Sequence, residues 1–295
     1  MKFFCFSRRI DSILECKVMN KQPLIAIASL LFVACGNSVT HISRLDISNA
    51  LASEEQPVKV VLLPKLSHAK MTVPAWAQGK VVANVKLKPG VKAVALTFDD
   101  GPWPHYTHQI LSILKKHKIK ATFFMVGSEL AKRPQVGRDV VAAGMVVGNH
   151  SWDHPAKPSN AISQVKHTDS EIFKELGIYT HLFRPPYGIL KNGMAAQAKR
   201  EKHAVMLWSV DSEDWQRPAA SIITKTVMRE VYPGGIILMH DGGGNRSHTV
   251  QALEMIIPGL KKKGYNFVTI PELMEMRYVP PKPVKKHPVR QPGKK

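Results

Sequence analysis

The chain has 295 residues, 42 of them Lys or Arg and 22 Asp or Glu, so its formal net charge at pH 7 is +20. All three cysteines lie within the first 35 residues, which excludes a disulfide framework in the remainder. The basic charge predicts anionic partners. No basic motif interleaved with aromatic residues is present, however, so nucleic acid is not an expected partner.

The first predicted element is an export signal in residues 1–35. Residues 23–34 form an apolar run that is too short to span a bilayer but fits the apolar region of such a signal. Residues 31–35, Leu-Phe-Val-Ala-Cys, resemble a bacterial lipoprotein cleavage site, so we expect a lipid anchor on Cys35. The alternative is cleavage that releases a secreted protein. A compact signal would start at Met19, with residues 1–18 as an upstream extension.

Three further regions follow the signal. Residues 36–83 contain Pro57, Pro64 and Pro74 with little periodicity, and predict a tether and a short lead-in. Residues 84–278 predict a single folded domain. Residues 279–295 carry six Lys or Arg among prolines and predict an extended arm. For an exported chain with this charge, anionic wall polymer or lipid headgroups are the expected anionic partners.

Apolar runs alternate with helical patterns between residues 84 and 278. The predicted strands are 91–98, 121–126, 145–149, 181–184, 203–210, 235–240 and 265–270. Ile162, Val165, Ile172 and Leu176 share one helix face, as do apolar residues between 250 and 260, where Pro258 predicts a kink or an early end. The alternation predicts an α/β fold. Since about 190 residues are short of the ~250 typical of an eight-fold barrel, a smaller, distorted barrel fits best.

Polar clusters end or follow five of these runs. They are 97–102 (Thr-Phe-Asp-Asp-Gly-Pro), 150–154 (His-Ser-Trp-Asp-His), 184–188 (Arg-Pro-Pro-Tyr-Gly), 211–215 (Asp-Ser-Glu-Asp-Trp) and 238–241 (Leu-Met-His-Asp). Because the carboxyl ends of barrel strands meet at one rim, we expect the clusters to share one site. Taken singly, each has a simpler explanation: a turn, a chance histidine pair, a surface arginine or core side chains.

The first two clusters together contain a ligand set for a metal ion. A carboxylate with two imidazoles suits a borderline divalent cation with open coordination positions. His150 and His154 are four residues apart and can share one turn of a helix, and Asp99 or Asp100 would complete the set. The remaining aspartate would then lie beside the cation, free for a role other than ligation.

In order and in content, the five motifs resemble those of the polysaccharide deacetylases with a NodB-homology domain, carbohydrate esterase family four. The resemblance covers about residues 91–276. It implies a distorted (β/α)7 barrel and metal-dependent removal of acetyl groups from sugars. It assigns Asp100, His150 and His154 as metal ligands and Asp99 as the general base. Every position of the motifs that carries chemistry is present, so an active enzyme is expected.

Two further roles concern the cluster at 184–188. Arg184 is the candidate partner of Asp99, because a guanidinium can hold a carboxylate with two parallel hydrogen bonds. Pro185 and Pro186 have no N–H, so Tyr187 supplies the first backbone donor after Arg184. The resemblance assigns that same donor to the oxyanion hole.

The last two clusters supply the expected acid and the substrate contacts. His240 is the expected general acid, with Asp214 holding its ring and raising its pKa. Trp215 and Leu238 are expected to line the slot for the acetyl methyl group, although each taken singly is more simply a core residue. Four other carboxylates are expected to be solvated loop residues: Asp153, Asp211, Glu213 and Asp241.

These inferences predict an exported, lipid-anchored, monomeric and metal-dependent deacetylase of N-acetylated polysaccharide, with N-acetylglucosamine of peptidoglycan as the first substrate. Zinc is the expected metal, with cobalt, nickel and manganese as alternatives. Other hydrolase candidates are a deacetylase of chitin or chitooligosaccharides and an O-acetyl xylan esterase. An iron oxygenase would use the same ligands but would have no role for Asp99 with Arg184 or His240 with Asp214. A wall-binding lipoprotein without activity is the non-enzymatic alternative.

Overall fold

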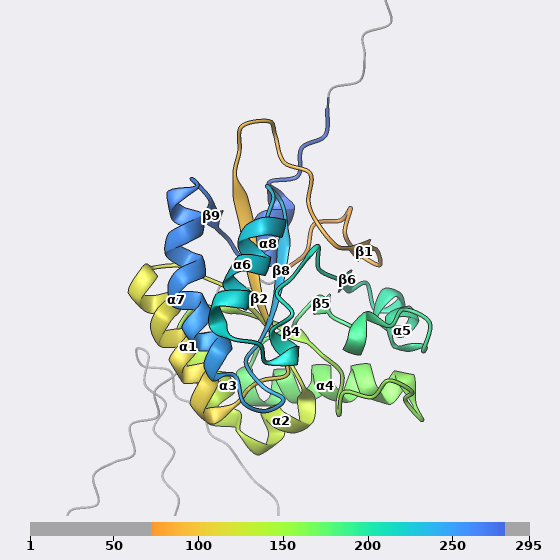
Figure 1. Ribbon diagram of the computed structural model, residues 1–295. Helices are drawn as coiled ribbons and strands as arrows, with labels where there is room; N and C mark the ends of the chain where they lie inside the picture. Colours follow the sequence, from red (N-terminus) through yellow and green to blue (C-terminus); the bar gives the residue numbers. More distant parts are fainter. Residues whose placement is uncertain (1–71, 281–295) are drawn as a thin grey trace, which may run out of the picture. The chain divides into compact units, whose positions relative to one another are not determined.

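The computed structural model describes residues 72–280. The predicted export signal with Met19 and Cys35, most of the predicted tether and nearly all of the basic tail lie outside these residues. Within 72–280, every helix is too short or too polar to cross a membrane. Figure 1 shows the described residues as a sheet surrounded by helices.

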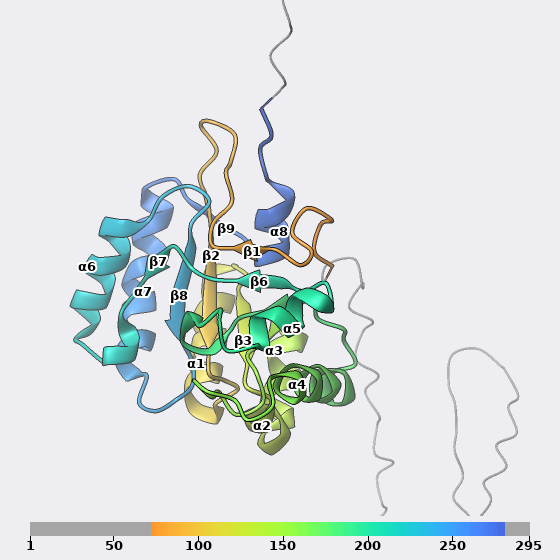
Figure 2. The same cartoon turned by 90° about the vertical axis from the view of Figure 1, so that its right-hand side faces the viewer.

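A curled sheet of parallel strands forms the centre of the fold (Figures 1 and 2). Its order is β1-β6-β5-β4-β3-β2-β8-β7, and β9 pairs with β2 off this path. This confirms the predicted α/β barrel class in the form of an open half-barrel. The strand bounds are β1 (Val81–Val82), β2 (Ala93–Asp99), β3 (Thr122–Met125), β4 (Val146–Asn149), β5 (Leu182–Phe183), β6 (Ala204–Met206), β7 (Val210–Asp211), β8 (Ile236–His240) and β9 (Asn266–Phe267).

The strand register brings the carboxyl ends of the central strands to one level. Asp99, the last residue of β2, lies opposite Phe124 in β3 and His240 in β8. Asn149, the last residue of β4, lies opposite Met125 and Phe183. Residues that directly follow these strands therefore start from neighbouring positions on one edge of the sheet.

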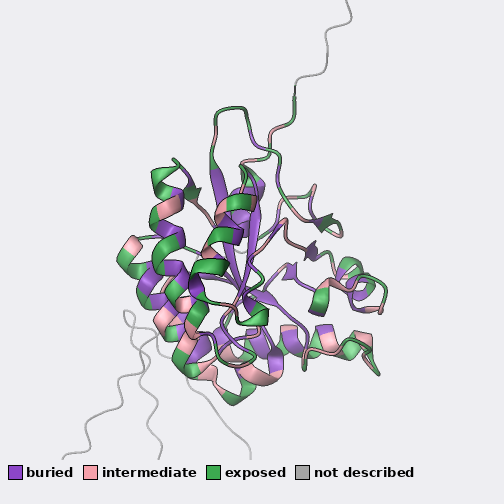
Figure 3. Ribbon diagram, in the orientation of Figure 1, coloured by how far each residue is buried: buried purple, intermediate pink, exposed green. Residues whose placement is uncertain are grey.

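The core lies on both faces of the sheet, as Figure 3 shows for the central strands. All seven residues of β2 are buried, which fits its continuous apolar run, since a parallel strand covered on both faces has no polar side. Phe98 of β2 and Phe123 of β3 stack with ring centroids 5.0 Å apart. The described part of the predicted lead-in also packs here: Val73 and Ala77 are buried, and β1 pairs with β6.

Eight helices of the described residues surround the sheet. They are α1 (Pro104–His117), α2 (Gly127–Lys132), α3 (Pro134–Ala142), α4 (Ala161–Leu176), α5 (Met194–Arg200), α6 (Ala220–Glu230), α7 (Ser247–Lys262) and α8 (Ile270–Glu275). Asn160 caps α4 by accepting a hydrogen bond from the Ser163 amide, and Gly177 ends the helix with φ 69°. Helix α7 runs through Pro258 to Lys262, so of the two predicted outcomes, a kink or an early end, the early end does not occur.

Two predicted strands differ from the structure. The run 203–210 forms two strands, because β6 pairs with β1 and β5 whereas β7 pairs with β8. The run 265–270 forms only the short β9, because Thr269 caps α8 in a capping box with Glu272, and Pro271 fits the first turn of that helix. In both cases an apolar run continues past the end of a strand.

Candidate active site

Asp100, His150 and His154 come together at the carboxyl edge of the sheet. Asp100 directly follows β2, His150 directly follows β4, and His154 lies in the loop after it. The Oδ1 atom of Asp100 lies 3.5 Å from Nε2 of His150 and 3.4 Å from Nε2 of His154. Three possible ligand atoms of these residues all lie within 4.8 Å of one another. The sequence-predicted ligand set is therefore assembled in the structure.

The loop after β4 reaches this arrangement without a helix, contrary to our expectation. Ser151 and His154 have left-handed φ angles of 68° and 58°, which turn the chain back on itself. The Asn149 side chain accepts a hydrogen bond from the Ser151 amide at 2.8 Å, and the Ser151 hydroxyl accepts one from the His154 amide at 3.1 Å. Asn149 is itself held because its amide group donates to the Val165 carbonyl at 2.9 Å. Sequence reasoning missed Asn149, although it immediately precedes the predicted ligand His150.

The chemistry of this set fits a divalent cation. Asp100 Oδ1 is buried and has no hydrogen-bond partner among the described residues. Burial and the charge of His150 lower the pKa of His154 to about 4, which keeps this imidazole neutral, as ligation requires. Burial also acts to lower the pKa of His150, but Asp99 and Asp100 outweigh it and raise that pKa. The carboxylates thus favour a positive charge where the three residues meet.

His150 is also oriented for ligation by a contact on its other nitrogen. Its Nδ1 donates to the Arg184 backbone carbonyl at 2.8 Å, which leaves Nε2 directed at Asp100. Burial would raise the pKa of Asp100, but the adjacent His150 imidazole and the charges of the other imidazoles lower it below the ordinary value. The lowered pKa keeps Asp100 ionised, which is the state in which a carboxylate can bind a metal ion.

Asp99 lies beside the ligand set and is held from behind by Arg184. Nη1 of the fully buried Arg184 donates to Asp99 Oδ1 at 2.7 Å and to the Thr97 hydroxyl at 2.8 Å. Asp99 Oδ2 lies 3.6 Å from His150 Nε2 and so faces the ligand atoms. The expected pair exists, but it has one hydrogen bond instead of two parallel ones. The second terminal nitrogen of Arg184 instead lies 3.4 Å from the Leu207 carbonyl.

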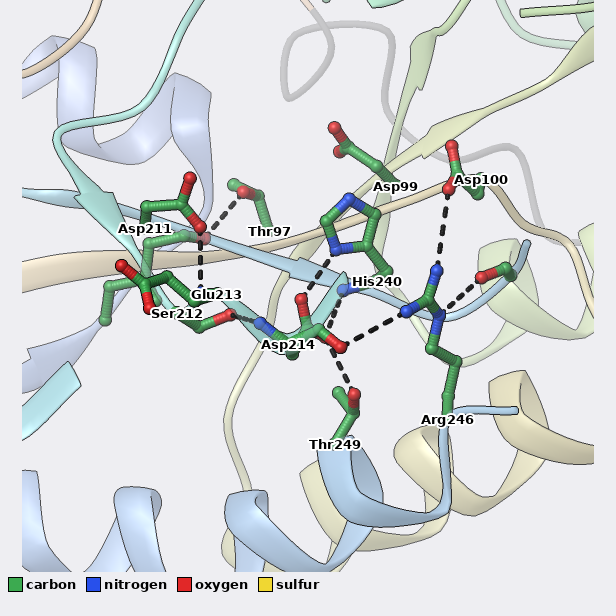
Figure 4. Close-up of polar contacts among 12 residues, drawn as sticks. Thr97, Asp99, Asp100, Asp211, Ser212, Glu213, Asp214, His240, Arg246 and Thr249 are labelled. Atoms are coloured by element: carbon green, nitrogen blue, oxygen red, sulfur yellow. Dashed lines mark hydrogen bonds and ion pairs between the residues drawn. The ribbon is translucent and has the colours of Figure 1, made fainter. Parts of the chain in front are cut away.

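His240 and Asp214 form a second pair across the site (Figure 4). Nδ1 of His240 donates to Asp214 Oδ1 at 2.6 Å, and the His240 amide donates to Oδ2 at 2.9 Å. The Thr249 hydroxyl also donates to Oδ2, at 2.7 Å. Burial would lower the pKa of His240, but the charge and hydrogen bond of Asp214 raise it to about 9. His240 therefore carries a proton at neutral pH.

Arg246 connects the two halves of the site and was missed from the sequence. Its side chain is buried, and Nε donates to the Gly242 carbonyl at 2.6 Å. Nη1 donates to the Asp214 carbonyl at 3.3 Å, and Nη2 lies 3.9 Å from Asp100 Oδ2, as drawn in Figure 4. Its only sequence signal is its place after the glycine run that follows β8. That signal does not show that the side chain turns back toward Asp100.

Asp241 corrects the expectation of a solvated loop carboxylate. It is only 1% exposed, and Oδ2 accepts a hydrogen bond from the Thr107 hydroxyl at 2.5 Å. Burial, together with the charges of Asp100 and Asp99, raises the pKa of Asp241 to about 7. The close approach requires glycine at 101, because a Cβ there would lie 2.2 Å from Asp241 Oδ2. By contrast, Asp153 and Glu213 are exposed and Asp211 is half-buried.

The three residues expected to contact the substrate differ in their exposure. Tyr187 has a left-handed φ of 56° and is 64% exposed. Its ring packs edge-on against the His154 ring, with the two ring centroids 4.5 Å apart. Trp215 is 53% exposed, which is against the simpler interpretation as core, whereas Leu238 is buried within β8. The exposed rings of Tyr187 and Trp215 are available to contact a ligand.

A second group of possible metal ligands in residues 72–280 is explained by internal contacts. Asp169, Glu201 and His203 bring three candidate atoms within 4.8 Å. His203 Nε2 lies 3.2 Å from Asp169 Oδ2, and Asn149 donates to Asp169 Oδ1 at 2.8 Å. Glu201 accepts from Gln197 at 2.8 Å. This group supports Asn149, and through it the loop that carries His150 and His154.

Comparison with known proteins gives one consistent result. The sequence model of a family described as polysaccharide deacetylase matches residues 86–206. A peptidoglycan-N-acetylglucosamine deacetylase of Bacillus cereus is 38% identical over 192 residues, which are 63% of this chain and 90% of that protein. A chitooligosaccharide deacetylase of Bradyrhizobium is 34% identical over 201 residues, 62% of this chain and 91% of that protein.

The fold comparison agrees with the sequence comparison. A crystal structure of the Bc1960 peptidoglycan N-acetylglucosamine deacetylase superimposes with a TM-score of 0.63 and 35% sequence identity. The match covers 67% of this chain and 94% of that one.

Proposed function

Because the chain belongs to the polysaccharide deacetylases, carbohydrate esterase family four, we propose that it is a metal-dependent hydrolase that removes the acetyl group from N-acetylglucosamine of peptidoglycan. One observation carries this proposal. A buried, unpartnered Asp100 oxygen faces two imidazoles, while a carboxylate and a protonated imidazole flank it, each held by its own buried partner.

Asp100, His150 and His154 would hold the cation. Bound there, a divalent ion lowers the pKa of a water ligand to about 7 and polarises the acetyl carbonyl. Asp99 Oδ2 faces the ligand atoms and takes the proton from the attacking water as general base. Arg184 keeps that oxygen directed at the site by binding Oδ1.

His240 completes the proton transfers on the other side of the site. The leaving sugar nitrogen must be protonated before the C–N bond breaks, and the raised pKa of His240, about 9, means that a proton is available at neutral pH. Asp214 holds Nδ1, so Nε2 is the atom that donates. Asp99 and His240 thus act as separate base and acid, each fixed by a different partner.

Tyr187, Trp215 and Leu238 are proposed to bind the acetyl group. The Tyr187 amide would donate to the oxyanion, which gains charge as water adds to the carbonyl carbon. Trp215 and Leu238 would line the slot for the methyl group, and the exposed rings of Trp215 and Tyr187 would contact the sugar. These three roles rest on the family motifs and, for Tyr187, on its contact with the His154 ring.

Location, metal and assembly belong to the same proposal. The apolar run at 23–34 and the lipoprotein-type sequence ending at Cys35 favour export and a lipid anchor in the cell envelope. Zinc is favoured by the mixed nitrogen and oxygen ligands, and a monomer is the simplest assembly. One relative of similar coverage is named as a chitooligosaccharide deacetylase. An envelope location and the strongly basic net charge of this chain favour peptidoglycan over soluble chitooligosaccharides.

The test is acetate release from peptidoglycan, chitin oligomers and acetylated xylan, each with and without a chelator and after zinc is added back. The proposal predicts release from peptidoglycan that stops with the chelator and returns with zinc. Release from chitin oligomers alone would redirect the substrate to chitooligosaccharides, and release from xylan alone would indicate an O-acetyl esterase. No acetate from any substrate after zinc is restored, or oxygen consumption with iron, would contradict a deacetylase.

A further inference from the structure

Exposed lysines gather at the end of the fold opposite the candidate active site. Ten of them lie in the segments that lead into β2, β3 and β9, that is, at the amino ends of these strands. We define this lysine face by its members: Lys86, Lys88, Lys92, Lys115, Lys116, Lys118, Lys120, Lys261, Lys262 and Lys263. The active-site residues lie at the carboxyl ends of the same sheet.

Direct contacts show that the three segments lie side by side. The Lys92 ammonium donates to the Lys263 carbonyl at 3.1 Å, which joins the segment before β2 to the segment before β9. The Lys261 ammonium donates to the His117 carbonyl at 2.8 Å, which joins the end of α7 to the end of α1. In Figures 1 and 2 the loop before β2 and helix α8 lie at the upper end of the fold, and α2 lies at the lower end.

Few carboxylates balance this face. The segments 84–92, 115–120 and 261–264 contain no Asp or Glu. Nearby, Glu254 lies 2.8 Å from Lys116, and Glu230 lies 2.6 Å from Arg229, so these two offset single cations. Helix α8 adds Glu272 and Glu275. The opposite rim mixes both signs, with Asp99, Asp100, Asp211, Glu213, Asp214 and Asp241 close in sequence or space to Arg184, Arg217 and Arg246.

The end of the described chain adds to the same face. The Tyr278 amide donates to the Lys86 carbonyl at 2.8 Å, so the chain reaches its basic tail beside the lysine face. Residues 281–295 carry six Lys or Arg and no Asp or Glu. Tyr232, which is 40% exposed, lies against residues 84–91 at this end. A tyrosine among lysines is typical of surfaces that meet the polar region of a bilayer.

We propose that the lysine face docks this protein on an anionic bilayer surface, with the active site directed away from the lipid. A planar surface of anionic headgroups can meet all three segments at once, because the lysines come from separate loops and helix ends at one end of the fold. Each lysine near such a surface strengthens binding roughly fivefold, and the effect falls with salt. The proposal goes beyond the proposed function and does not depend on which glycan is hydrolysed.

The test compares two triple variants of the full chain that lose the same charge. The first changes Lys88, Lys118 and Lys262 to Gln, all on the lysine face. The control changes Lys157, Lys191 and Lys225 to Gln, which are exposed elsewhere on the fold. None of these six ammonium groups makes a hydrogen bond or an ion pair with another residue of 72–280, so neither variant removes a side-chain contact there.

Binding is measured by sedimentation with vesicles of phosphatidylcholine, with and without phosphatidylglycerol, at low and high salt. We expect salt-sensitive binding that requires phosphatidylglycerol, weakened roughly a hundredfold in the lysine-face variant and much less in the control. A melting temperature close to that of the unchanged protein shows that each variant is folded.

Three results would overturn the proposal. Equal loss in the two triple variants would mean that only net charge matters. Binding that does not require phosphatidylglycerol or does not fall with salt would exclude an electrostatic surface contact. Loss of binding to soluble poly(glycerol phosphate) in the lysine-face variant, with unchanged vesicle binding, would assign the face to an anionic polymer instead of a bilayer.

Discussion

The contact between His240 and Asp214 determines the pH above which the rate of acetate release should fall. His240 must be protonated to act as the acid, and its pKa is raised to about 9 chiefly by Asp214 acting against burial. A group with a raised pKa keeps its proton up to that pH and loses it above. We therefore expect kcat/KM of the unchanged protein to decline as the pH rises through about 9.

The change Asp214→Asn should move this decline to lower pH. In the unchanged protein, Nδ1 of His240 lies 2.6 Å from an Asp214 carboxylate oxygen. The substitution removes the negative charge but retains an oxygen that can accept a hydrogen bond from Nδ1. A hydrogen bond to a charged group contributes roughly 1.5–3 kcal/mol. Since one pKa unit corresponds to about 1.4 kcal/mol, the high-pH decline should move down by roughly one to two units.

The assay is acetate release at low substrate concentration across the pH range, with the same metal content in both proteins. Thr249→Val is the matched control, because it removes only one hydrogen bond to Asp214 Oδ2 and keeps the carboxylate. It should shift the decline less than Asp214→Asn. A decline at the same pH in Asp214→Asn and in the unchanged protein would refute the assignment of His240 as an acid tuned by Asp214.

Three further changes test the surrounding contacts. Asn149→Ala removes the acceptor for the Ser151 amide and should weaken metal binding roughly 10–100-fold, measured by competition with a chelator. Arg184→Met leaves Asp99 buried without its partner and should lower the free energy of unfolding by about 3–5 kcal/mol; adding Asp99→Asn should recover part of this loss in urea unfolding. Asp241→Asn should gain stability over the unchanged metal-free protein as pH rises from 3.8 to about 7, because in this range the carboxyl of the unchanged protein ionises in the unfolded chain but keeps its proton in the folded one.

The sequence predicts best those parts of the fold that depend on local pattern. The apolar runs of β2 and β8 are continuous and end in polar residues, so their carboxyl ends could be placed within a residue or so. The run 203–210 has a single polar residue, Ser209, between β6 and β7, and its division is decided by pairing with different neighbours. Likewise, a capping box overrides the apolar pattern at Thr269.

The candidate site shows the same division between local and distant contacts. Motifs at strand ends, together with the family resemblance, selected Asp100, His150 and His154, and these residues meet because parallel strands bring their ends to one edge. Arg246 and Asp241 were not recognised, since what matters for each is a contact with residues far away in the chain. Asn149 was not recognised because its contact with the Ser151 amide depends on a second contact with the distant Val165. The positive φ angles of Ser151 and His154, which replace the expected helical turn, likewise follow from that packing.

The central claim is that one cation held by Asp100, His150 and His154 activates water, with Asp99 as a separate base. Metal content and acetate release, measured together in Asp99→Asn and Asp100→Asn, test it most directly. The account predicts that Asp99→Asn keeps its metal but releases no acetate, and that Asp100→Asn loses both. Continued acetate release by Asp99→Asn, or full metal retention by Asp100→Asn, would contradict it.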